Sequence, residues 1–452
     1  MSSSKLTLLF VTSSPFFPSG YGVQTNLLMR ELEPYFNIIL LDNAIKIPKA
    51  DIIKNPYTLE QLFVFVRMIC STQQSEHVTV AKYILEKLSA YANTPGTAAS
   101  VGAPHKIYLR NKKSDFGWDM LRDIFYAEKC DAVLLFRDIV LKVDIKDVLN
   151  DTHLLKNMFM WTPIDHHKIS SFFDNDIIRT LMQKINIVSV SQHGNRALQT
   201  AKINPIACIY HSIDICGQRM FTADGLKRTR AEVRTRTLSN MNIHPDCFVV
   251  LMVMRFYGFN SRKMLDVNFR GVQNYHNTTN QQCHLIYKFT SDDISEVQTV
   301  SKIIDALGMK SYTTIIAQTQ SSLAELYQTA DVLLSCTGGE GFGVPIIEAQ
   351  YNGCPVIATD CTAMSELVCN GALVQPVTYI MNIAMCGYAV TADKDICVAL
   401  NGVARRTTAC STQLSLAGHL FVHTNFNATT IATQWRQLLL TSIVAKNDSV
   451  ST

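Results

Sequence analysis

Residues 337–360 read TGGEGFGVPIIEAQYNGCPVIATD, and this stretch combines a glycine-rich loop, a helix start and a strand. The glycines on both sides of Glu340 let the backbone approach another group closely. Pro345 suits the first turn of a helix that carries a second carboxylate, Glu348, and the apolar run at 355–360 follows as a strand. Such a loop-to-helix junction offers free N–H groups and a positive dipole end, so it can bind an anion while the carboxylates accept hydrogen bonds from hydroxyls.

Short apolar runs recur on both sides of this stretch, with segments of helical length between them. In the second half of the chain they begin near residues 248, 284, 313, 331 and 355; in the first half they lie at 6–12, 37–41, 132–136, 156–161 and 185–190. Strands that alternate with helices in this way are typical of parallel sheets. The pattern predicts an α/β protein with two Rossmann-like domains.

The length of 452 residues also favours two domains, because single hydrophobic cores stop growing below this size. We predict a first domain at 1–215, with an insertion at about 50–115, and a second domain at 246–425. The arginine-rich residues 216–245 lack strong apolar periodicity and are expected to connect the domains and to contain the hinge. An amphipathic helix within 426–452 follows the second sheet.

The composition excludes several classes of protein. The 41 basic side chains nearly balance the 37 acidic ones, and no dense basic block interleaves with aromatic residues, so no nucleic-acid partner is expected. The 13 cysteines include no CxxC pair, which favours reduced thiols over a disulfide framework or a zinc ribbon. The apolar run near the N-terminus is too short for a signal peptide or a membrane span. We therefore expect a cytoplasmic protein and leave peripheral membrane contact open.

The stretch TGGEGFGVPIIEAQYNGCPVIATD resembles the E-x7-E signature of the family 4 retaining glycosyltransferases, which have the GT-B fold of two facing Rossmann-like domains. The resemblance implies that Glu340 contacts hydroxyls of the donor sugar and that Glu348 holds the nucleotide ribose. The donor would also be bound along the backbone of Gly341, Phe342, Gly343 and Val344. The resemblance further implies that the last helix returns to the first domain. The alternative for this stretch is a tightly packed turn with two solvated acids.

A second motif, MRFYGFNSRK at residues 254–263, follows the first strand of the second domain. It offers Arg255, Arg262 and Lys263 at the carboxyl end of that strand, where open α/β sheets bind ligands. The family places an arginine and a lysine here to neutralise the departing diphosphate. We assign these roles to Arg255 and Lys263, which lie further apart than the family's pair usually does. The alternative is a solvated basic loop.

Residues 19–32, SGYGVQTNLLMREL, resemble the glycine loop of the family's first domain. In this loop Gly20 and Gly22 would leave space for the donor phosphate and the acceptor near a helix N-terminus. The alternative is a glycine turn that serves only to reverse the chain.

Residues 160–170, MWTPIDHHKIS, place acidic and histidine side chains after a strand, where the family often has such a residue near the acceptor hydroxyl. Asp165 and His166 are our candidates to orient or deprotonate that hydroxyl. The alternative is an exposed loop whose histidines have no catalytic role.

These resemblances imply transfer of a sugar from a nucleoside-diphosphate sugar, the co-substrate, to a hydroxyl of a carbohydrate, lipid-linked or protein acceptor, with retention of configuration. We expect no metal and no further cofactor: GT-B transferases usually work without metal, and the acids of FFDNDII and SDDIS are interpreted as solvated, namely Asp174, Asp176, Asp292 and Asp293. Two alternatives stay open: a GT-B epimerase or phosphorylase, and a non-catalytic nucleotide-sugar-binding protein.

Overall fold

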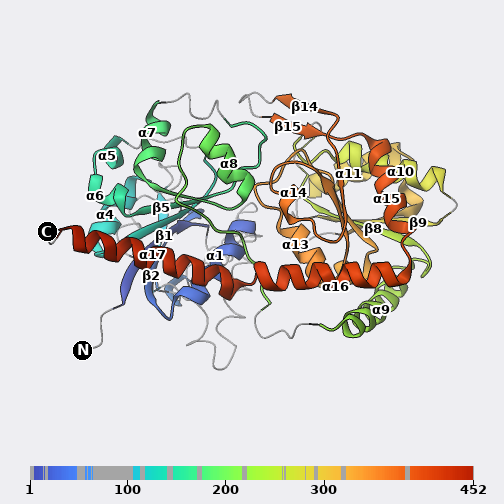
Figure 1. The fold of residues 1–452 in the computed structure, drawn as a ribbon, viewed down its shortest axis with the longest axis horizontal. Helices are drawn as coiled ribbons and strands as arrows, with labels where there is room; N and C mark the ends of the chain where they lie inside the picture. Colours follow the sequence, from blue (N-terminus) through green and yellow to red (C-terminus); the bar gives the residue numbers. More distant parts are fainter. Residues whose placement is uncertain are drawn as a thin grey trace.

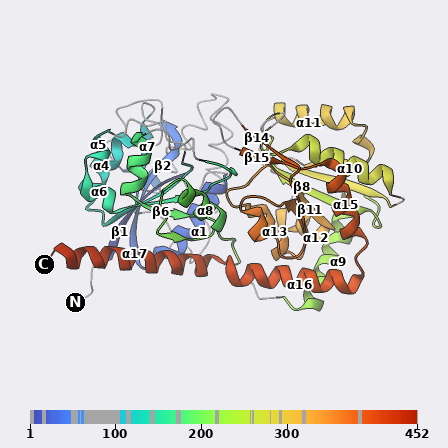
Figure 2. The ribbon, with the colours of Figure 1, turned by 45° about the horizontal axis from the view of Figure 1, so that its top comes forward.

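The computed structural model of the chain contains two α/β lobes side by side, and its last two helices run along both of them (Figure 1, Figure 2). It describes residues 5–13, 15, 19–47, 56–58, 60–62, 64, 105–111, 118–139, 146–169, 176–215, 221–256, 258, 261–279, 281–289, 294–316, 322–381 and 387–450. Each lobe is built on a parallel sheet, which confirms the predicted fold class.

The first lobe contains a parallel sheet of seven strands in the order β3-β2-β1-β4-β5-β6-β7. The strands are β1 (Leu6–Thr12), β2 (Phe36–Ile47), β3 (Lys106–Asn111), β4 (Ala132–Phe136), β5 (Met158–Thr162), β6 (Asn186–Ser189) and β7 (Ala207–Cys208). Alternate residues of β1 enter two apolar clusters, with Leu8 and Phe10 in one and Leu9 and Val11 in the other. This burial on both faces explains why the strands read as continuous apolar runs.

The described helices of the first lobe lie between its strands along the chain. They are α1 (Gly20–Leu32), α4 (Trp118–Ala127), α5 (Lys146–Leu149), α6 (Thr152–Lys156), α7 (Asp176–Lys184) and α8 (Gln192–Thr200). Three of them, α1, α6 and α8, begin at polar caps. At α8, for example, the hydroxyl of Ser191 accepts a hydrogen bond from the N–H of Gly194 at 3.0 Å. Most of the insertion predicted at about 50–115 lies outside the described residues, but β3, near its end, pairs with β2 and belongs to the sheet.

The second lobe contains a parallel sheet of six strands in the order β10-β9-β8-β11-β12-β13. The strands are β8 (Phe248–Met254), β9 (Cys283–Phe289), β10 (Thr313–Ile316), β11 (Val332–Ser335), β12 (Val356–Thr359) and β13 (Ala372–Val374). In both lobes the order reverses beside the first strand, so the carboxyl ends of β1 and β4, and of β8 and β11, border the crevice where such sheets bind ligands. A hairpin of β14 (Thr378–Met381) and β15 (Gly387–Val390) follows.

The helices of the second lobe are α9 (Ala223–Asn240), α10 (Leu265–Thr278), α11 (Ile294–Ala306), α12 (Leu323–Thr329), α13 (Val344–Tyr351), α14 (Met364–Leu367), α15 (Asp393–Ala404) and α16 (Thr408–Asn425), with a 3₁₀ turn at Lys310–Tyr312. The helix α9 fills much of the segment 216–245 that we expected to connect the domains. Its Arg230 donates to the carbonyls of Ala330 and Gly353, and its Arg234 donates to the carbonyl of Thr329 at 2.5 Å. These arginines bind the carboxyl ends of α12 and α13, so α9 is part of the second lobe.

The last helix, α17 (Ala428–Val450), lies along the first lobe, whereas α16 lies along the second (Figure 1). The ring of Trp435 on α17 meets that of Trp161 on β5 with centroids 5.5 Å apart. The chain therefore crosses between the lobes twice, and the crossings lie side by side, because the N–H of Ile213 donates to the carbonyl of Phe426 at 2.9 Å.

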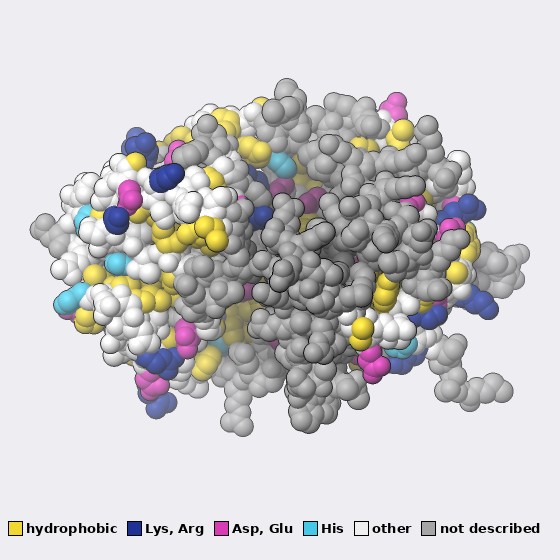
Figure 3. Space-filling model, turned by 180° about the vertical axis from the view of Figure 1, so that it is seen from behind, with side chains coloured by type: hydrophobic (Ala, Val, Ile, Leu, Met, Phe, Trp, Pro, Cys, Tyr) yellow, Lys and Arg dark blue, Asp and Glu magenta, His cyan; other side chains and the backbone are white. Residues whose placement is uncertain are grey.

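The surface carries charges of both signs. On the face shown in Figure 3, the basic and acidic side chains of the described residues are interspersed around both lobes, in keeping with their nearly equal numbers. Within the described part of the chain, no helix combines the length and the apolar character needed to cross a membrane.

Candidate functional site

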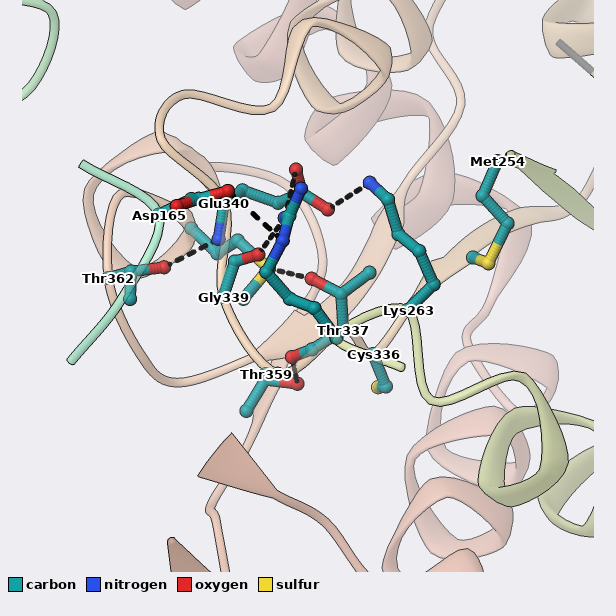
Figure 4. Close-up of polar contacts among 12 residues, drawn as sticks. Asp165, Met254, Lys263, Cys336, Thr337, Gly339, Glu340, Thr359 and Thr362 are labelled. Carbon is teal, nitrogen blue, oxygen red and sulfur yellow. Dashed lines mark hydrogen bonds and ion pairs between the residues drawn. The ribbon is translucent and has the colours of Figure 1, made fainter. Parts of the chain in front are cut away.

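The candidate site lies between the lobes, around the glycine-rich loop that joins β11 to α13 (Figure 4). Glu340 stands in this loop, and each of its carboxylate oxygens has its own cation. Oε1 lies 2.6 Å from Nζ of Lys263, and Oε2 lies 3.0 Å from Nη1 of Arg262. Burial would raise the pKa of Glu340, but Lys263 and Arg262 outweigh it and lower that pKa, so the carboxylate is ionised.

Arg262 also reaches the other lobe. Its Nε lies 3.1 Å from Oδ2 of Asp165, in the loop after β5, and Oδ1 of Asp165 lies 2.8 Å from Nδ1 of His166. Burial acts to raise the pKa of Asp165, but the charge of Arg262 and the hydrogen bond with His166 prevail and hold it well below its usual range. The residues that we assigned to the acceptor side are thus joined to the donor-side Glu340 through one guanidinium.

The glycines of the loop allow the lobes to meet. A Cβ on Gly339 would lie 2.3 Å from the carbonyl oxygen of Asp165, and a Cβ on Gly341 would lie 2.4 Å from Cβ of Pro163. The absence of side chains at these two positions is therefore required by the opposite lobe as it stands in this structure. Gly343, the N-cap of α13, has φ of +108°, a left-handed conformation that other residues rarely adopt.

The start of α13 is held between the lobes by an aromatic side chain. Phe342 is 3% exposed, and its ring meets those of His211 and Phe426 with centroids 5.0 and 5.8 Å apart. Val344 is the first residue of the helix. The packing of Phe342 leaves only the backbone of this residue for donor binding.

Glu348, one turn along α13, lines a second part of the interlobe space. Its Oε2 accepts a hydrogen bond from the hydroxyl of Tyr327 at 2.9 Å. Burial raises the pKa of Glu348, and the Tyr327 hydrogen bond opposes that shift. The carboxylate borders a cavity of about 230 Å³ that is lined from both lobes, with Val23 and Ile213 on one side and Val344 on the other.

The predicted glycine loop of the first lobe leads into α1. Gly20 is its first residue, and a Cβ there would meet nothing within 4 Å. The buried Gly22 donates its N–H to the hydroxyl of Ser19 at 3.1 Å, which caps the helix. Between them, Tyr21 donates to Oδ1 of Asp138, just past β4, at 2.5 Å. Of the preceding loop, residues 14 and 16–18 lie outside the described residues.

The two cations that we selected, Arg255 and Lys263, lie in different surroundings. Arg255 is exposed just after β8, whereas, among the described residues, the cations in contact with Glu340 are Lys263 and its neighbour Arg262. The motif at 254–263 pointed to all three residues, but sequence spacing could not decide which arginine turns toward the glycine loop. A role for Arg255 at the diphosphate stays a prediction.

The acids that we interpreted as solvated are partly described. Asp176 lies in the first turn of α7, while Asp174, Asp292 and Asp293 lie outside the described residues. In the described part of the chain, no three His, Cys, Asp or Glu side chains are grouped so that they could hold a metal ion.

Sequence reasoning missed the residues that support the loop. The N–H of Glu340 donates to the hydroxyl of Thr362 at 2.9 Å. The buried Asn268 on α10 donates to the carbonyl of Cys336 at 2.8 Å and accepts from its N–H at 3.2 Å, which fixes the end of β11. A lone threonine or asparagine carries no sequence signal for such a role.

A second polar contact joins the lobes through α14. The carboxylate of Glu366 on α14 accepts hydrogen bonds from the N–H groups of Gln192 and His193 at 3.0 and 3.1 Å, and from the hydroxyl of Tyr210 at 3.0 Å. A carboxylate of the second lobe thus lies at the N-terminus of α8 in the first, where the helix dipole favours negative charge.

Known proteins are similar to this chain in part of its sequence and in its fold. Residues 276–383 match the family model described as glycosyl transferases group 1. No curated protein matches the sequence. The family match assigns this segment, which contains Glu340 and Glu348, to the glycosyltransferases.

Solved structures of low identity share the fold. HepE of Anabaena in complex with UDP and glucose is similar with a TM-score of 0.60 and 14% identity, over 96% of this chain and 100% of that one. A glycosyltransferase from Rickettsia africae gives 0.64 and 15%, over 98% and 99% of the two chains. Sucrose-phosphate synthase from Thermosynechococcus elongatus gives 0.64 and 13%, over 98% and 100%. At this identity the likeness shows the GT-B fold.

Proposed function

We propose that this glycosyltransferase moves a sugar from a nucleoside-diphosphate sugar to an acceptor hydroxyl and retains the anomeric configuration. One observation carries the proposal: Lys263 and Arg262 converge on Glu340, beside the start of α13, at the seam between two Rossmann-like lobes. The retention of configuration and the role of an E-x7-E signature are supported by the resemblance of residues 337–360 to the family 4 enzymes.

The cations suit a departing diphosphate. As the bond between sugar and phosphate breaks, negative charge grows on the leaving group, so positive groups placed there stabilise the transition state more than the ground state. In the structure, Glu340 pairs with both cations. We propose that a bound diphosphate takes over Lys263, and that Glu340 then accepts hydrogen bonds from the hydroxyls of the donor sugar.

The cavity beside Glu348 suits the ribose of the donor. A carboxylate that accepts a hydrogen bond from Tyr327 keeps further lone pairs for ribose hydroxyls. The Anabaena protein HepE has been solved with UDP and with UDP-glucose, so a uridine-diphosphate sugar is the first donor to test.

The dyad of Asp165 and His166 faces this site from the first lobe, and we propose that it orients the acceptor hydroxyl. The acceptor would be a carbohydrate, a lipid-linked saccharide or a protein. Closure of the lobes would exclude water from the donor and limit its hydrolysis. Because cations of the protein neutralise the diphosphate, we propose that the reaction is independent of metal, and chelation of divalent cations should leave transfer unchanged.

The test is transfer of labelled sugars from a panel of nucleotide donors by Lys263→Ala and Glu340→Ala. Each change should lower the turnover number by about 10²-fold or more, the usual effect of removing one group that stabilises transition-state charge. Lys310→Ala is the matched control, because Lys310 is 82% exposed and its nearest acid, Asp305, lies 3.7 Å away. Undiminished transfer by either site variant would contradict the proposal.

A further inference from the structure

We propose that Arg262 is a positioning residue that couples donor binding in the second lobe to placement of the acceptor in the first. The inference rests on the proposed function, but it concerns a residue to which the resemblance gives no role. Arg262 would act through Asp165 and Glu340, which it holds at the same time.

The first support is the geometry of the guanidinium. Nε lies 3.1 Å from the carboxylate of Asp165, and Nη1 lies 3.0 Å from that of Glu340. Nη1 also donates to the carbonyl of Gly339, in the loop that carries Glu340. A planar guanidinium presents its N–H groups in fixed directions, so its orientation toward one carboxylate determines its orientation toward the other. The side chain is only 20% exposed, which limits screening by water.

The second support is the set of contacts between the segment of Asp165 and the second lobe. Asp165 belongs to a segment whose backbone abuts the loop, since a Cβ on Gly339 would lie 2.3 Å from its carbonyl oxygen. His166, which pairs with Asp165, stacks on Tyr388 of β15 with ring centroids 5.4 Å apart, and the N–H of His167 donates to the carbonyl of Gly387 at 2.9 Å. Arg262 adds to these contacts a bridge from the carboxylate of Asp165 to that of Glu340, so it connects the position of the dyad with the position of the glycine-rich loop.

The third support is that closure does not depend on Arg262 alone. Glu366 joins the lobes through the start of α8, and neither it nor Tyr210 contacts Asp165, Arg262 or Glu340 in the hydrogen bonds described above. An arginine that served only to hold the lobes together would duplicate this contact. The position of Arg262 between the carboxylates of Asp165 and Glu340 instead suits a coupling role.

A specific consequence follows for the reaction. Without Arg262, Lys263 still lies beside Glu340, so the donor can bind and its bond to phosphate can break. Asp165 would lose its cation and no longer hold His166 toward the acceptor, so water would compete better for the activated sugar. Loss of Arg262 should therefore reduce transfer more than it reduces donor hydrolysis.

The experiment compares Arg262→Gln, Arg262→Lys, Asp165→Asn and the double variant Arg262→Gln with Asp165→Asn in the full chain. Transfer and donor hydrolysis are measured separately with a labelled uridine-diphosphate sugar, together with the KM for the acceptor. Hydrogen–deuterium exchange of residues 163–169 and 338–343 reports the bridge without any substrate. Tyr210→Phe is the matched control, because it removes an interlobe hydrogen bond to Glu366 and leaves the carboxylate of Glu366 at the N–H groups of Gln192 and His193.

We expect Arg262→Gln to lower transfer by at least about tenfold and to raise the ratio of hydrolysis to transfer, with the double variant no worse than the more severe single one, since the two side chains act as a unit. Arg262→Lys should rescue part of the transfer. Exchange in both segments should rise. Multiplicative effects in the double variant, unchanged exchange, or the same hydrolysis ratio in Tyr210→Phe would overturn the proposal. If the wild-type protein turns over no donor, the proposed function fails, and the exchange experiment still decides whether Arg262 bridges the lobes.

Discussion

At the scale of single residues, two opposite effects act on the carboxylate of Asp165. Burial disfavours its charge, whereas Arg262 and His166 favour it, and the net result is a pKa well below the usual range. Glu340 shows the same balance, with Lys263 and Arg262 as its cations. Glu348, which has a tyrosine hydroxyl as partner, has a raised pKa instead. The pKa values of Asp165 and Glu340 are thus lowered because cations lie beside them, whereas burial raises the pKa of Glu348 and the hydrogen bond of Tyr327 does not outweigh it.

The lowered pKa of Asp165 predicts how stability depends on pH. A carboxyl whose folded pKa is lowered contributes stability that is fully present above its unfolded pKa of about 3.9 and is lost as pH falls through the folded value. Asp165→Asn should therefore lower the melting temperature at pH 7, and the difference from wild type should shrink as pH falls below about 4. Asp246→Asn is the control, since Asp246 is 88% exposed. A difference for Asp165→Asn that stays constant with pH would contradict the assignment.

At the scale of elements, the loop between β11 and α13 has to fit against both lobes. The segment between β11 and α13 carries Glu340 and ends at Gly343, the N-cap of α13. It approaches the first lobe within contact distance at Gly339 and Gly341. The glycines had suggested close approach to a ligand. The structure adds a second demand, because the backbone around Pro163 and Asp165 occupies the space that side chains would need.

A pair of glycine substitutions tests whether the opposite lobe excludes side chains from this loop. Gly341→Ala would place Cβ 2.4 Å from Cβ of Pro163, so we expect the lobes to separate, transfer to fall, and the melting temperature to drop. In Gly402→Ala the new Cβ on α15 would meet nothing within 4 Å, and alanine should stabilise the helix by about 0.5–1 kcal/mol. Thermal unfolding and transfer assays distinguish the two. Equal behaviour of both variants would show that the loop is not constrained by the opposite lobe.

At the scale of the whole molecule, α17 connects the lobes as well as the site does, because it follows the second lobe in the chain and packs on the first. This helix begins at the second crossing of the chain and packs on the first lobe, with the fully buried Trp435 against Trp161. Trp161 in turn meets His211, whose ring contacts Phe342 beside the glycine loop. A continuous row of aromatic rings therefore leads from α17 to the start of α13.

Substitution of Trp435 tests the contribution of this helix. Trp435→Ala should lower the free energy of unfolding by about 3–5 kcal/mol, because it leaves a large cavity between α17 and the sheet. Leu440→Ala on the same helix is the control, since Leu440 is 38% exposed and should change stability little. Denaturant unfolding of both variants measures the difference. A loss for Trp435→Ala no larger than that for Leu440→Ala would show that α17 is only loosely attached.

The sequence by itself determined the fold class, most strands and the placement of Glu340 and Glu348 on one loop and its helix. Continuous apolar runs identify strands buried on both faces, and glycine and proline mark the junction between them. The runs fail for β3, which lies within the predicted insertion, for β7 and β13, which have two and three residues, and for the hairpin strands β14 and β15, of which β14 is exposed. Strands that are short or exposed leave no clear periodic pattern.

Only the tertiary structure decided which charged groups meet. Asp165 and Arg262 belong to different lobes, and nothing in either motif encodes their distance of 3.1 Å. The same holds for Glu366 at the start of α8 and for the arginines of α9, whose partners are backbone carbonyls. Hydrophobic periodicity is a local property of the chain, whereas the partner of a charge depends on how the two lobes are placed against each other.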